Sequence, residues 1–185
     1  MTQQDKRSSN QTSRRDFIRA SGVAAVGSAV AANLGAVPAV HAAGRDTIRV
    51  GLIGCGARGS GAAENCAKSS EGVQIVAMAD VAQSQIDNCR RRLKQVVPDS
   101  YDVADKNCFV GLDAYKEVIL SGVDYVILAT PPGFRPWHLE AAVAAGKNVF
   151  TEKPVAVDGP GIRKCFAVYE QALQKGLAIG AGTQR

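Results

Sequence analysis

Beyond residue 46, short apolar runs rich in Val, Ile and Ala alternate with segments in which apolar residues recur at helical spacing. The short runs are typical of buried strands, and they predict strands at 47–53, 73–79, 107–110, 124–129, 148–151 and 177–180. The segments between them predict helices at 58–68, 82–96, 113–120, 136–145 and 161–175. Residues 98–106 predict a polar connection.

The alternation of these two patterns predicts the fold class. Strands that are apolar along their whole length need cover on both faces, as in a parallel sheet with helices on either side. Successive parallel strands must then be joined by right-handed crossovers. We therefore predict a single α/β domain over residues 46–185, built on a doubly wound parallel sheet. In such sheets ligands bind beyond the carboxyl ends of the strands.

The first 42 residues have a different pattern and are predicted to be a separate unit. Arg14 and Arg15 form a twin-arginine pair that is followed by two hydrophobic residues. No Asp, Glu, Lys or Arg occurs in residues 20–44, where a small-residue pattern suits cleavage after Ala42. This resembles a twin-arginine (Tat) export signal, which implies recognition by the Tat machinery and a periplasmic or secreted protein. A retained membrane anchor is the alternative.

Charge and cysteine content exclude several classes of partner and site. The chain has 185 residues and a net charge of +5, but residues 1–42 carry five basic and two acidic residues, so only +2 remains for the domain. The high isoelectric point is therefore poor support for a nucleic-acid partner. The five cysteines are widely spaced without a C-x-x-C pair, and His138 is the one histidine outside the signal. We predict neither a metal site nor a disulfide framework.

A glycine-rich motif follows the first predicted strand. Residues 54–59 have the sequence Gly-Cys-Gly-Ala-Arg-Gly and lie at the start of a predicted helix. Asp80 follows at the end of the second predicted strand. In a dinucleotide fingerprint of the Rossmann type, Gly54 permits the tight turn, Gly56 lets the backbone approach a pyrophosphate, and Gly59 lets the helix pack closely on the strand. The helix N-terminus presents free amides to the phosphates. A flexible turn without a ligand is the alternative.

The cofactor predicted from this motif is NAD. Asp80 can accept hydrogen bonds from both ribose hydroxyls, and its charge would oppose a 2′-phosphate. Arg58 leaves NADP open, because its side chain could reach around to such a phosphate. The alternative role for Asp80 is that of an N-cap for the helix after it.

A second group of candidate residues follows the strand predicted at 124–129. Thr130 lies where that strand meets the predicted crevice, and Pro131 begins a loop with few backbone donors, which suits packing against a flat ring. An ordinary strand–helix loop is the alternative. For His138 two places remain open, the nicotinamide end of the pocket and a half-exposed helix start.

The next strand ends in Glu152-Lys153-Pro154, which places two opposite charges at the floor of the predicted cleft. Lys153 is expected to be desolvated there, with Glu152 holding its side chain and Pro154 fixing the backbone beyond it. A lysine in this place can bond a substrate hydroxyl and help it lose a proton as hydride leaves the carbon. The alternative is a surface salt bridge at a strand end.

Taken together, these motifs resemble the Gfo/Idh/MocA oxidoreductase family. The likeness runs from Thr47 to the end of the chain and rests on "VGLIGCGARG", "ADV", "DYVILATPPGFRPWHLEAAVAAGKNVFTEKP" and "GAGTQR". It implies a hydride transfer between nicotinamide and a sugar or cyclitol hydroxyl carbon, with Lys153 as the catalytic lysine. It also implies that the dinucleotide is contacted or bordered by Gly54, Cys55, Gly56, Ala57, Arg58, Gly59, Asp80, Thr130, Pro131, His138, Glu152, Lys153 and Gln184.

One departure from the family pattern is large. Members have a second α/β domain that supplies the substrate pocket and oligomer contacts, and Arg185 stands where that domain is expected to begin. The resemblance therefore implies a truncated member that is a homo-oligomer in its full-length form. Two other functions stay open: an NAD-dependent glycosidase of the same superfamily, and a nucleotide-binding module without catalysis. Lys153 argues against the glycosidase, because the resemblance implies no lysine in that slot for glycosidases.

Overall fold

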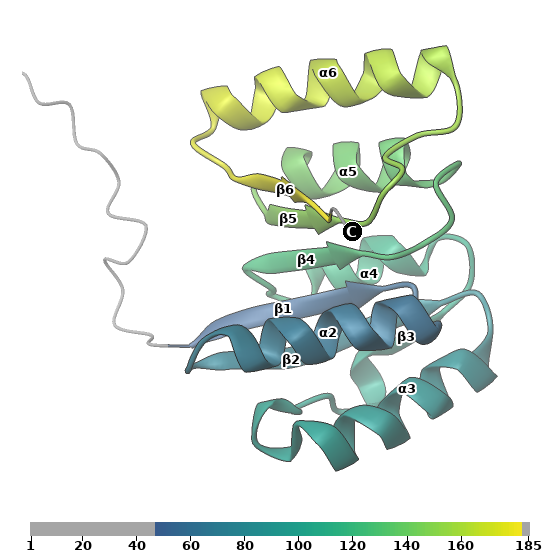
Figure 1. Cartoon of the computed structure of the whole chain (residues 1–185), viewed down its shortest axis with the longest axis vertical. Helices are drawn as coiled ribbons and strands as arrows, with labels where there is room; N and C mark the ends of the chain where they lie inside the picture. Colours follow the sequence, from purple (N-terminus) through teal and green to yellow (C-terminus); the bar gives the residue numbers. More distant parts are fainter. Residues whose placement is uncertain (1–46, 183–185) are drawn as a thin grey trace, which may run out of the picture. The chain divides into compact units, whose positions relative to one another are not determined.

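The computed structural model describes residues 47–182 of the chain. The predicted export signal at 1–42 and the candidate cofactor residue Gln184 lie outside the described residues. A six-stranded parallel sheet forms the centre, in the order β3-β2-β1-β4-β5-β6 (Figure 1). The α/β fold class with a doubly wound parallel sheet is thereby confirmed.

Each predicted element is present with bounds that agree within two residues. The strands are β1 Ile48–Ile53, β2 Val73–Asp80, β3 Cys108–Val110, β4 Tyr125–Leu128, β5 Asn148–Thr151 and β6 Ile179–Ala181. The helices are α2 Ala57–Ser69, α3 Gln83–Val96, α4 Ala114–Leu120, α5 Arg135–Ala144 and α6 Gly159–Gln174.

The polar connection at 98–106 has more structure than predicted. It contains two short 3₁₀ turns, η1 Pro98–Ser100 and η2 Asp105–Asn107, and Tyr101 forms a parallel bridge with Ile75 of β2. The hydroxyl of Tyr101 accepts a hydrogen bond of 3.0 Å from Nε of Arg90 on α3. These contacts are non-local, so the local sequence pattern does not reveal them.

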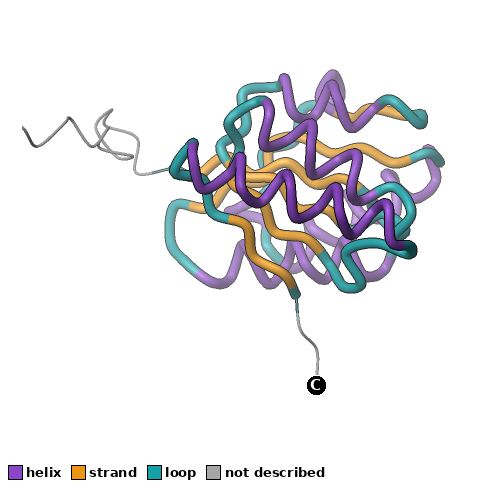
Figure 2. The backbone as a smooth tube through the Cα atoms, turned by 90° about the horizontal axis from the view of Figure 1, so that it is seen from above, coloured by secondary structure: helices purple, strands orange, loops and turns teal. Residues whose placement is uncertain are grey.

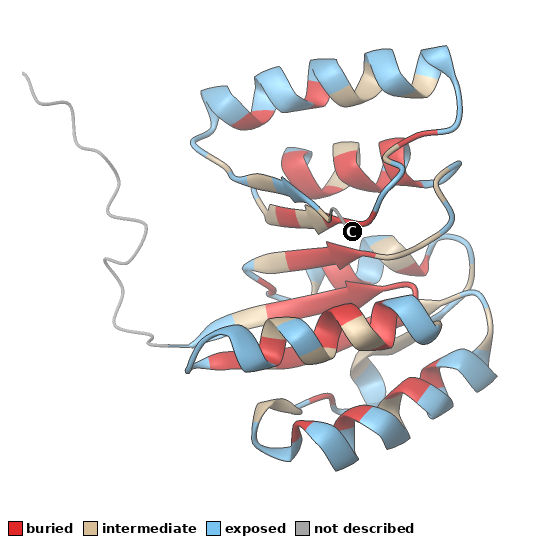
Figure 3. Cartoon of the chain, viewed as in Figure 1, coloured by how far each residue is buried: buried red, intermediate tan, exposed pale blue. Residues whose placement is uncertain are grey.

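Two hydrophobic clusters fill the space on either face of the sheet. One packs α2 and α3 against the strands through residues such as Ala63, Ile86 and Leu93. The other packs α4, α5 and α6 against the opposite face, for example through Val118 and Val143. Figure 2 shows the strands between helical layers, and Figure 3 shows the buried residues concentrated on the strands and the inner helix faces. Among the described residues, no helix has the length and apolar character needed to cross a bilayer.

The strand order places a topological switch at the centre of the sheet. The chain adds β2 and β3 on one side of β1, and then adds β4, β5 and β6 on the other side. The carboxyl ends of β1 and β4 are therefore neighbours whose following loops turn to opposite faces, and such a point opens a crevice for ligands. The glycine motif follows β1, the Thr130 loop follows β4, and Glu152-Lys153-Pro154 follows β5.

Candidate functional site

Two of the three motif glycines are required by the fold itself. Gly54 has φ +97, and a Cβ there would lie 2.8 Å from the carbonyl carbon of Ala129. At Gly59 a Cβ would lie 1.8 Å from the carbonyl oxygen of Gly54, which is far inside contact distance. Gly54 thus makes the turn beside β4, and Gly59 lets α2 approach the end of β1, as predicted for both.

The fold itself does not require a glycine at position 56. Its backbone, with φ −65 and ψ −177, is open to any residue, and an added Cβ would meet nothing within 4 Å. Gly56 is also the N-cap of α2, which starts at Ala57 and has no side-chain cap. The first amides of this helix therefore face open space with their partial positive charge. An anionic group fits there, and a side chain at Gly56 would occupy part of its place.

Asp80 is bound to the glycine loop by a contact that the sequence did not predict. Its Oδ2 accepts a 2.7 Å hydrogen bond from the amide of Cys55, and its Oδ1 accepts a 3.1 Å bond from the amide of Ala82. The N-cap of α3 is Ala82 itself, without a side-chain cap, so the capping alternative for Asp80 is wrong. Asp80 fixes the loop after β1 to the end of β2, and the loop in turn fixes its carboxylate.

A hollow of ≈ 480 Å³ lies beside this loop at the carboxyl edge of the sheet. Gly56 and Asp80 line it from one half of the sheet, and Thr130 and Pro131 line it from the other. Its remaining surface is largely apolar and includes Val81, Leu112, Tyr115, Phe134 and His138. The hollow thus combines the open amides of α2 with a carboxylate and flat apolar walls.

His138 is buried in the wall of this hollow, with 6% of its surface exposed. Its Nδ1 lies 3.1 Å from Oγ1 of Thr130, and its ring stacks on Tyr115 with 4.2 Å between centroids. Burial lowers the pKa of His138 to about 4, so the imidazole is neutral at pH 7. The half-exposed alternative is wrong. His138 lines the same hollow as Asp80, and its place at the nicotinamide end stays a prediction.

The carboxylate of Glu152 is paired with Arg58 rather than with Lys153. Nη2 of Arg58 lies 2.5 Å from Oε1 of Glu152, whose side chain is only 4% exposed. The contact with the Glu152 carboxylate raises the pKa of the Arg58 guanidinium. The ion pair joins the first turn of α2 to the end of β5, and the expected Glu152–Lys153 contact is not found among residues 47–182.

Lys153 is exposed, in contrast to the expected desolvated position. Its peptide bond to Pro154 is cis. No acidic side chain within residues 47–182 forms an ion pair with its ammonium group, so the alternative of a surface salt bridge at the strand end is wrong. The amine therefore lies at the carboxyl edge of the sheet and is available to hydrogen-bond a ligand.

Arg135 belongs to this region and was missed from the sequence. It is the first residue of α5, is 6% exposed, and donates to backbone carbonyls at the ends of two strands. Nε donates to Thr130 O at 2.7 Å, and Nη1 donates to Glu152 O at 2.7 Å and to Pro154 O at 2.6 Å. A cation at a helix N-terminus opposes the helix dipole. The position of Arg135 immediately before Pro136, near the predicted helix start, could therefore have indicated that this arginine has a specific role.

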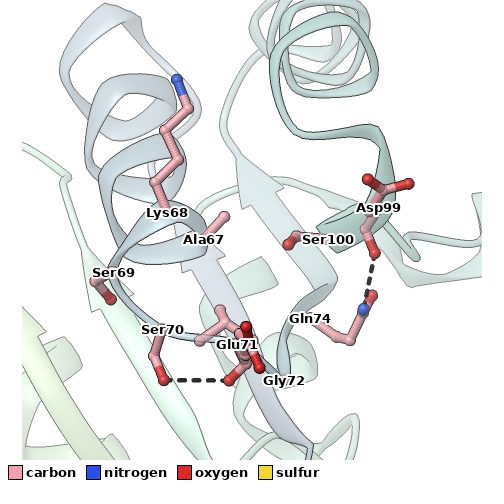
Figure 4. Close-up of a pocket in the computed structure, with 10 residues that line it drawn as sticks. Ala67, Lys68, Ser69, Ser70, Glu71, Gly72, Gln74, Asp99 and Ser100 are labelled. Atoms are coloured by element: carbon pink, nitrogen blue, oxygen red, sulfur yellow. Dashed lines mark hydrogen bonds between the residues drawn. The ribbon is translucent and has the colours of Figure 1, made fainter.

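A second hollow, of ≈ 560 Å³, lies at the amino end of β2 (Figure 4). It is open, and Ser70, Glu71, Gln74 and Asp99 are among its lining residues. Nε2 of Gln74 donates to Asp99 O at 2.8 Å across it. None of the candidate residues lines this larger hollow, so the carboxyl edge remains the candidate site. In the part of the chain that the structure describes, no cluster of His, Cys, Asp or Glu is suited to hold a metal ion, and all five cysteines are free.

Comparison with known proteins agrees with this geometry. Residues 48–183 match the sequence profile of the Gfo/Idh/MocA group, described as "Oxidoreductase family, NAD-binding Rossmann fold". A glycosyl hydrolase family 109 protein of Solibacter usitatus is 32% identical over 157 residues, covering 80% of this chain and 34% of the relative. An inositol 2-dehydrogenase of Pseudomonas savastanoi pv. phaseolicola is 31% identical, covering 63% of this chain and 31% of that enzyme.

A solved structure gives the same result for the fold. The scyllo-inositol dehydrogenase of Lactobacillus casei, with bound NAD(H) and scyllo-inositol, is 25% identical with a TM-score of 0.55. The match covers 74% of this chain and 36% of the dehydrogenase. The chain therefore spans about a third of the length of the relatives that it matches.

Proposed function

The chain belongs to the Gfo/Idh/MocA family of oxidoreductases, and from that premise we propose that it is the dinucleotide-binding part of an NAD-dependent oxidoreductase. The proposed reaction transfers a hydride between nicotinamide and a hydroxyl-bearing carbon of a sugar or cyclitol. Relatives named as inositol dehydrogenases support this substrate class.

Gly56 is the observation that carries the proposal. Gly54 and Gly59 are required by the fold, whereas Gly56 has an unstrained backbone and open space where a Cβ would stand. No side chain caps the first amides of α2, which begin at this residue. Residues 54–59, including Cys55 and Ala57 through their backbone, would hold the pyrophosphate there.

Asp80 supports NAD over NADP. Each oxygen of its carboxylate accepts one backbone hydrogen bond, and a carboxylate oxygen has a second lone pair that can accept from a ribose hydroxyl. The Arg58–Glu152 ion pair also supports this preference, because one nitrogen of the Arg58 guanidinium is already paired with Glu152. Thr130, Pro131 and His138 would complete the apolar wall against which the bound group lies.

Lys153 is the proposed catalytic residue. When bound, the nicotinamide group would supply the hydride acceptor or donor. Lys153 would bond the substrate hydroxyl oxygen through its amine and, in its neutral form, take the hydroxyl proton during oxidation. Its exposed position and lack of an ionic partner among residues 47–182 leave the amine available for that contact.

A glycosidase without net redox change is the second candidate, because the Solibacter usitatus relative carries that name. Lys153 favours the oxidoreductase, because the family resemblance implies no lysine at this position in the glycosidases. A glycosidase would release a free sugar without accumulating NADH. The two are separated by incubating the protein with NAD and either a cyclitol panel or an aryl glycoside. NADH accumulation at 340 nm supports the first, and aryl alcohol release without NADH accumulation supports the second.

The proposal is tested by calorimetric titration of the chain with NADH and NADPH, followed by assays of Lys153→Ala. We expect saturable binding with NADH preferred. In any preparation that oxidises a cyclitol, Lys153→Ala should lose about 10²–10⁴-fold in turnover while NADH affinity stays within a few-fold. Normal turnover in Lys153→Ala would end the catalytic assignment. Binding without turnover on any polyol would leave a cofactor-binding module.

We also propose that residues 1–42 direct Tat export to the periplasm. The twin pair Arg14 and Arg15 and the uncharged stretch that follows support this assignment. The double variant Arg14→Lys, Arg15→Lys should keep the protein in the cytoplasm when cell fractions are compared by immunoblot. Unchanged fractionation would contradict it.

A further inference from the structure

Arg135 lies in an electrostatically unfavourable place for a residue that serves stability alone. It is almost fully buried at the first position of α5, where the helix dipole already presents partial positive charge. Burial lowers the pKa of its guanidinium, and the carboxylate of Glu152, whose charge partly opposes that shift, is already paired with Arg58. A buried ion is often replaceable by an apolar residue at no loss of stability. Stability alone therefore does not account for a cation in this place.

The three acceptors of Arg135 provide another reason. Two of them, the carbonyls of Glu152 and Pro154, lie on either side of Lys153, and both bond to the same nitrogen, Nη1. One nitrogen that holds both carbonyls fixes their separation, and so restricts the backbone conformation of the lysine between them. The third acceptor, the carbonyl of Thr130, ties this arrangement to the end of β4 through Nε.

We propose that Arg135 is a positioning residue that sets the direction in which the Lys153 side chain leaves the backbone. It acts through the carbonyls of Glu152 and Pro154 and does not itself touch substrate or cofactor. The inference rests on the proposed function only for what Lys153 does, because the backbone restraint exists whether or not a dinucleotide binds.

The sequence offers a unique probe of this restraint. Lys153-Pro154 is the one Lys-Pro pair in the chain. Labelling with ¹³C-carbonyl lysine and ¹⁵N-proline therefore produces a single directly bonded ¹³C–¹⁵N pair, at the peptide between the two bonded carbonyls. Its resonance reports on the backbone at Lys153 and on no other lysine.

The test compares Arg135→Gln, Arg135→Lys and the control Arg163→Gln, which removes an exposed arginine from α6. Without ligand, Arg135→Gln should move the labelled resonance by more than its linewidth or split it into several lines. Arg135→Lys, which keeps a cationic donor, should restore part of the wild-type position, and Arg163→Gln should leave it unchanged. Circular dichroism checks the fold of each variant.

Two outcomes would overturn the inference. One is a folded Arg135→Gln variant with the wild-type resonance. The other is loss of the fold in both Arg135 variants, which would make the residue structural.

A second arm separates this inference from the proposed function. NADH should shift the labelled resonance in the wild type, and absence of that shift would count against the proposed function while leaving the ligand-free comparison intact. In a preparation that turns over a cyclitol, Arg135→Gln should lower kcat by about 100-fold with NADH affinity unchanged, as expected for a misplaced catalytic group. Equal losses in kcat and NADH affinity would contradict a positioning role.

Discussion

The two halves of the candidate site are held together by different means. The half at β1 and β2 is built from backbone: Gly54 and Gly59 allow close approach, and Asp80 bonds two amides. The half at β4 and β5 is built from buried polar side chains that reach between elements, namely Arg135, Glu152 and His138.

This difference has a physical consequence. The first half should lose stability when a substitution adds side-chain atoms, because its elements contact each other through backbone. The second half should lose stability when the charge or protonation of a side chain changes, because buried polar groups are stable only while they are paired or neutral. The variants below separate these two kinds of sensitivity.

Gly59→Ala should have the largest effect. Its Cβ would stand 1.8 Å from Gly54 O, so α2 must move away from β1. We expect a loss of about 3 kcal/mol or more in unfolding free energy, measured by urea denaturation. Gly61→Ala is the matched control, because its Cβ meets nothing within 4 Å and alanine is the better helix former. A Gly59→Ala variant as stable as wild type would show that the two elements do not pack through backbone.

Acid should weaken the second half through His138. Because burial lowers its pKa from 6.5 to about 4, the unfolded chain binds a proton between these values that the folded chain does not. Its contribution to stability is therefore complete above pH 6.5 and is lost as pH falls toward 4, by up to about 3 kcal/mol.

The measurement is the unfolding free energy between pH 7 and pH 4, in wild type and in His138→Gln. The variant should show a smaller decline over this window, because it has no proton to bind at that position. Parallel pH curves for the two proteins would refute the assignment of the decline to His138.

Gly56→Ala should leave the fold intact and weaken binding. The added Cβ meets no protein atom within 4 Å but enters the space in front of the α2 amides. We expect a loss of no more than about 1 kcal/mol in unfolding free energy, because alanine is a poorer N-cap than glycine. NADH affinity should fall about tenfold, equivalent to about 1.4 kcal/mol. Calorimetry on Gly56→Ala and Gly61→Ala side by side gives the comparison. Equal affinity in both would remove the main support for a phosphate at this helix.

Asp80→Ser should have the smallest effect, a change in cofactor preference of a few-fold. Removing the carboxylate relieves its repulsion of a 2′-phosphate, so the ratio of NADPH to NADH affinity should rise. Because Asp80 also binds the amides of Cys55 and Ala82, both affinities should fall somewhat. Separate titrations with the two cofactors measure this, and an unchanged ratio would restrict Asp80 to holding the loop.

Much of the fold was predictable because its determinants are local. Apolar runs such as residues 75–79 and the helical spacing of Ile86 and Leu93 predicted each element within two residues of its bounds. The glycine motif was equally readable, since turn, amides and helix start are adjacent along the chain. The 3₁₀ turns around Tyr101 were not, because they depend on contacts with Ile75 and Arg90.

The sequence by itself determined the order of strands and helices, the position of the glycine turn, and the residue types at each strand end. The tertiary structure decided their partners: Glu152 with Arg58, His138 with Thr130 and Tyr115, and Arg135 with the carbonyls around Lys153. The reason is that a charged or polar side chain pairs with whatever the sheet order brings beside it. That order, with β4 between β1 and β5, arises from long crossovers that no local pattern specifies.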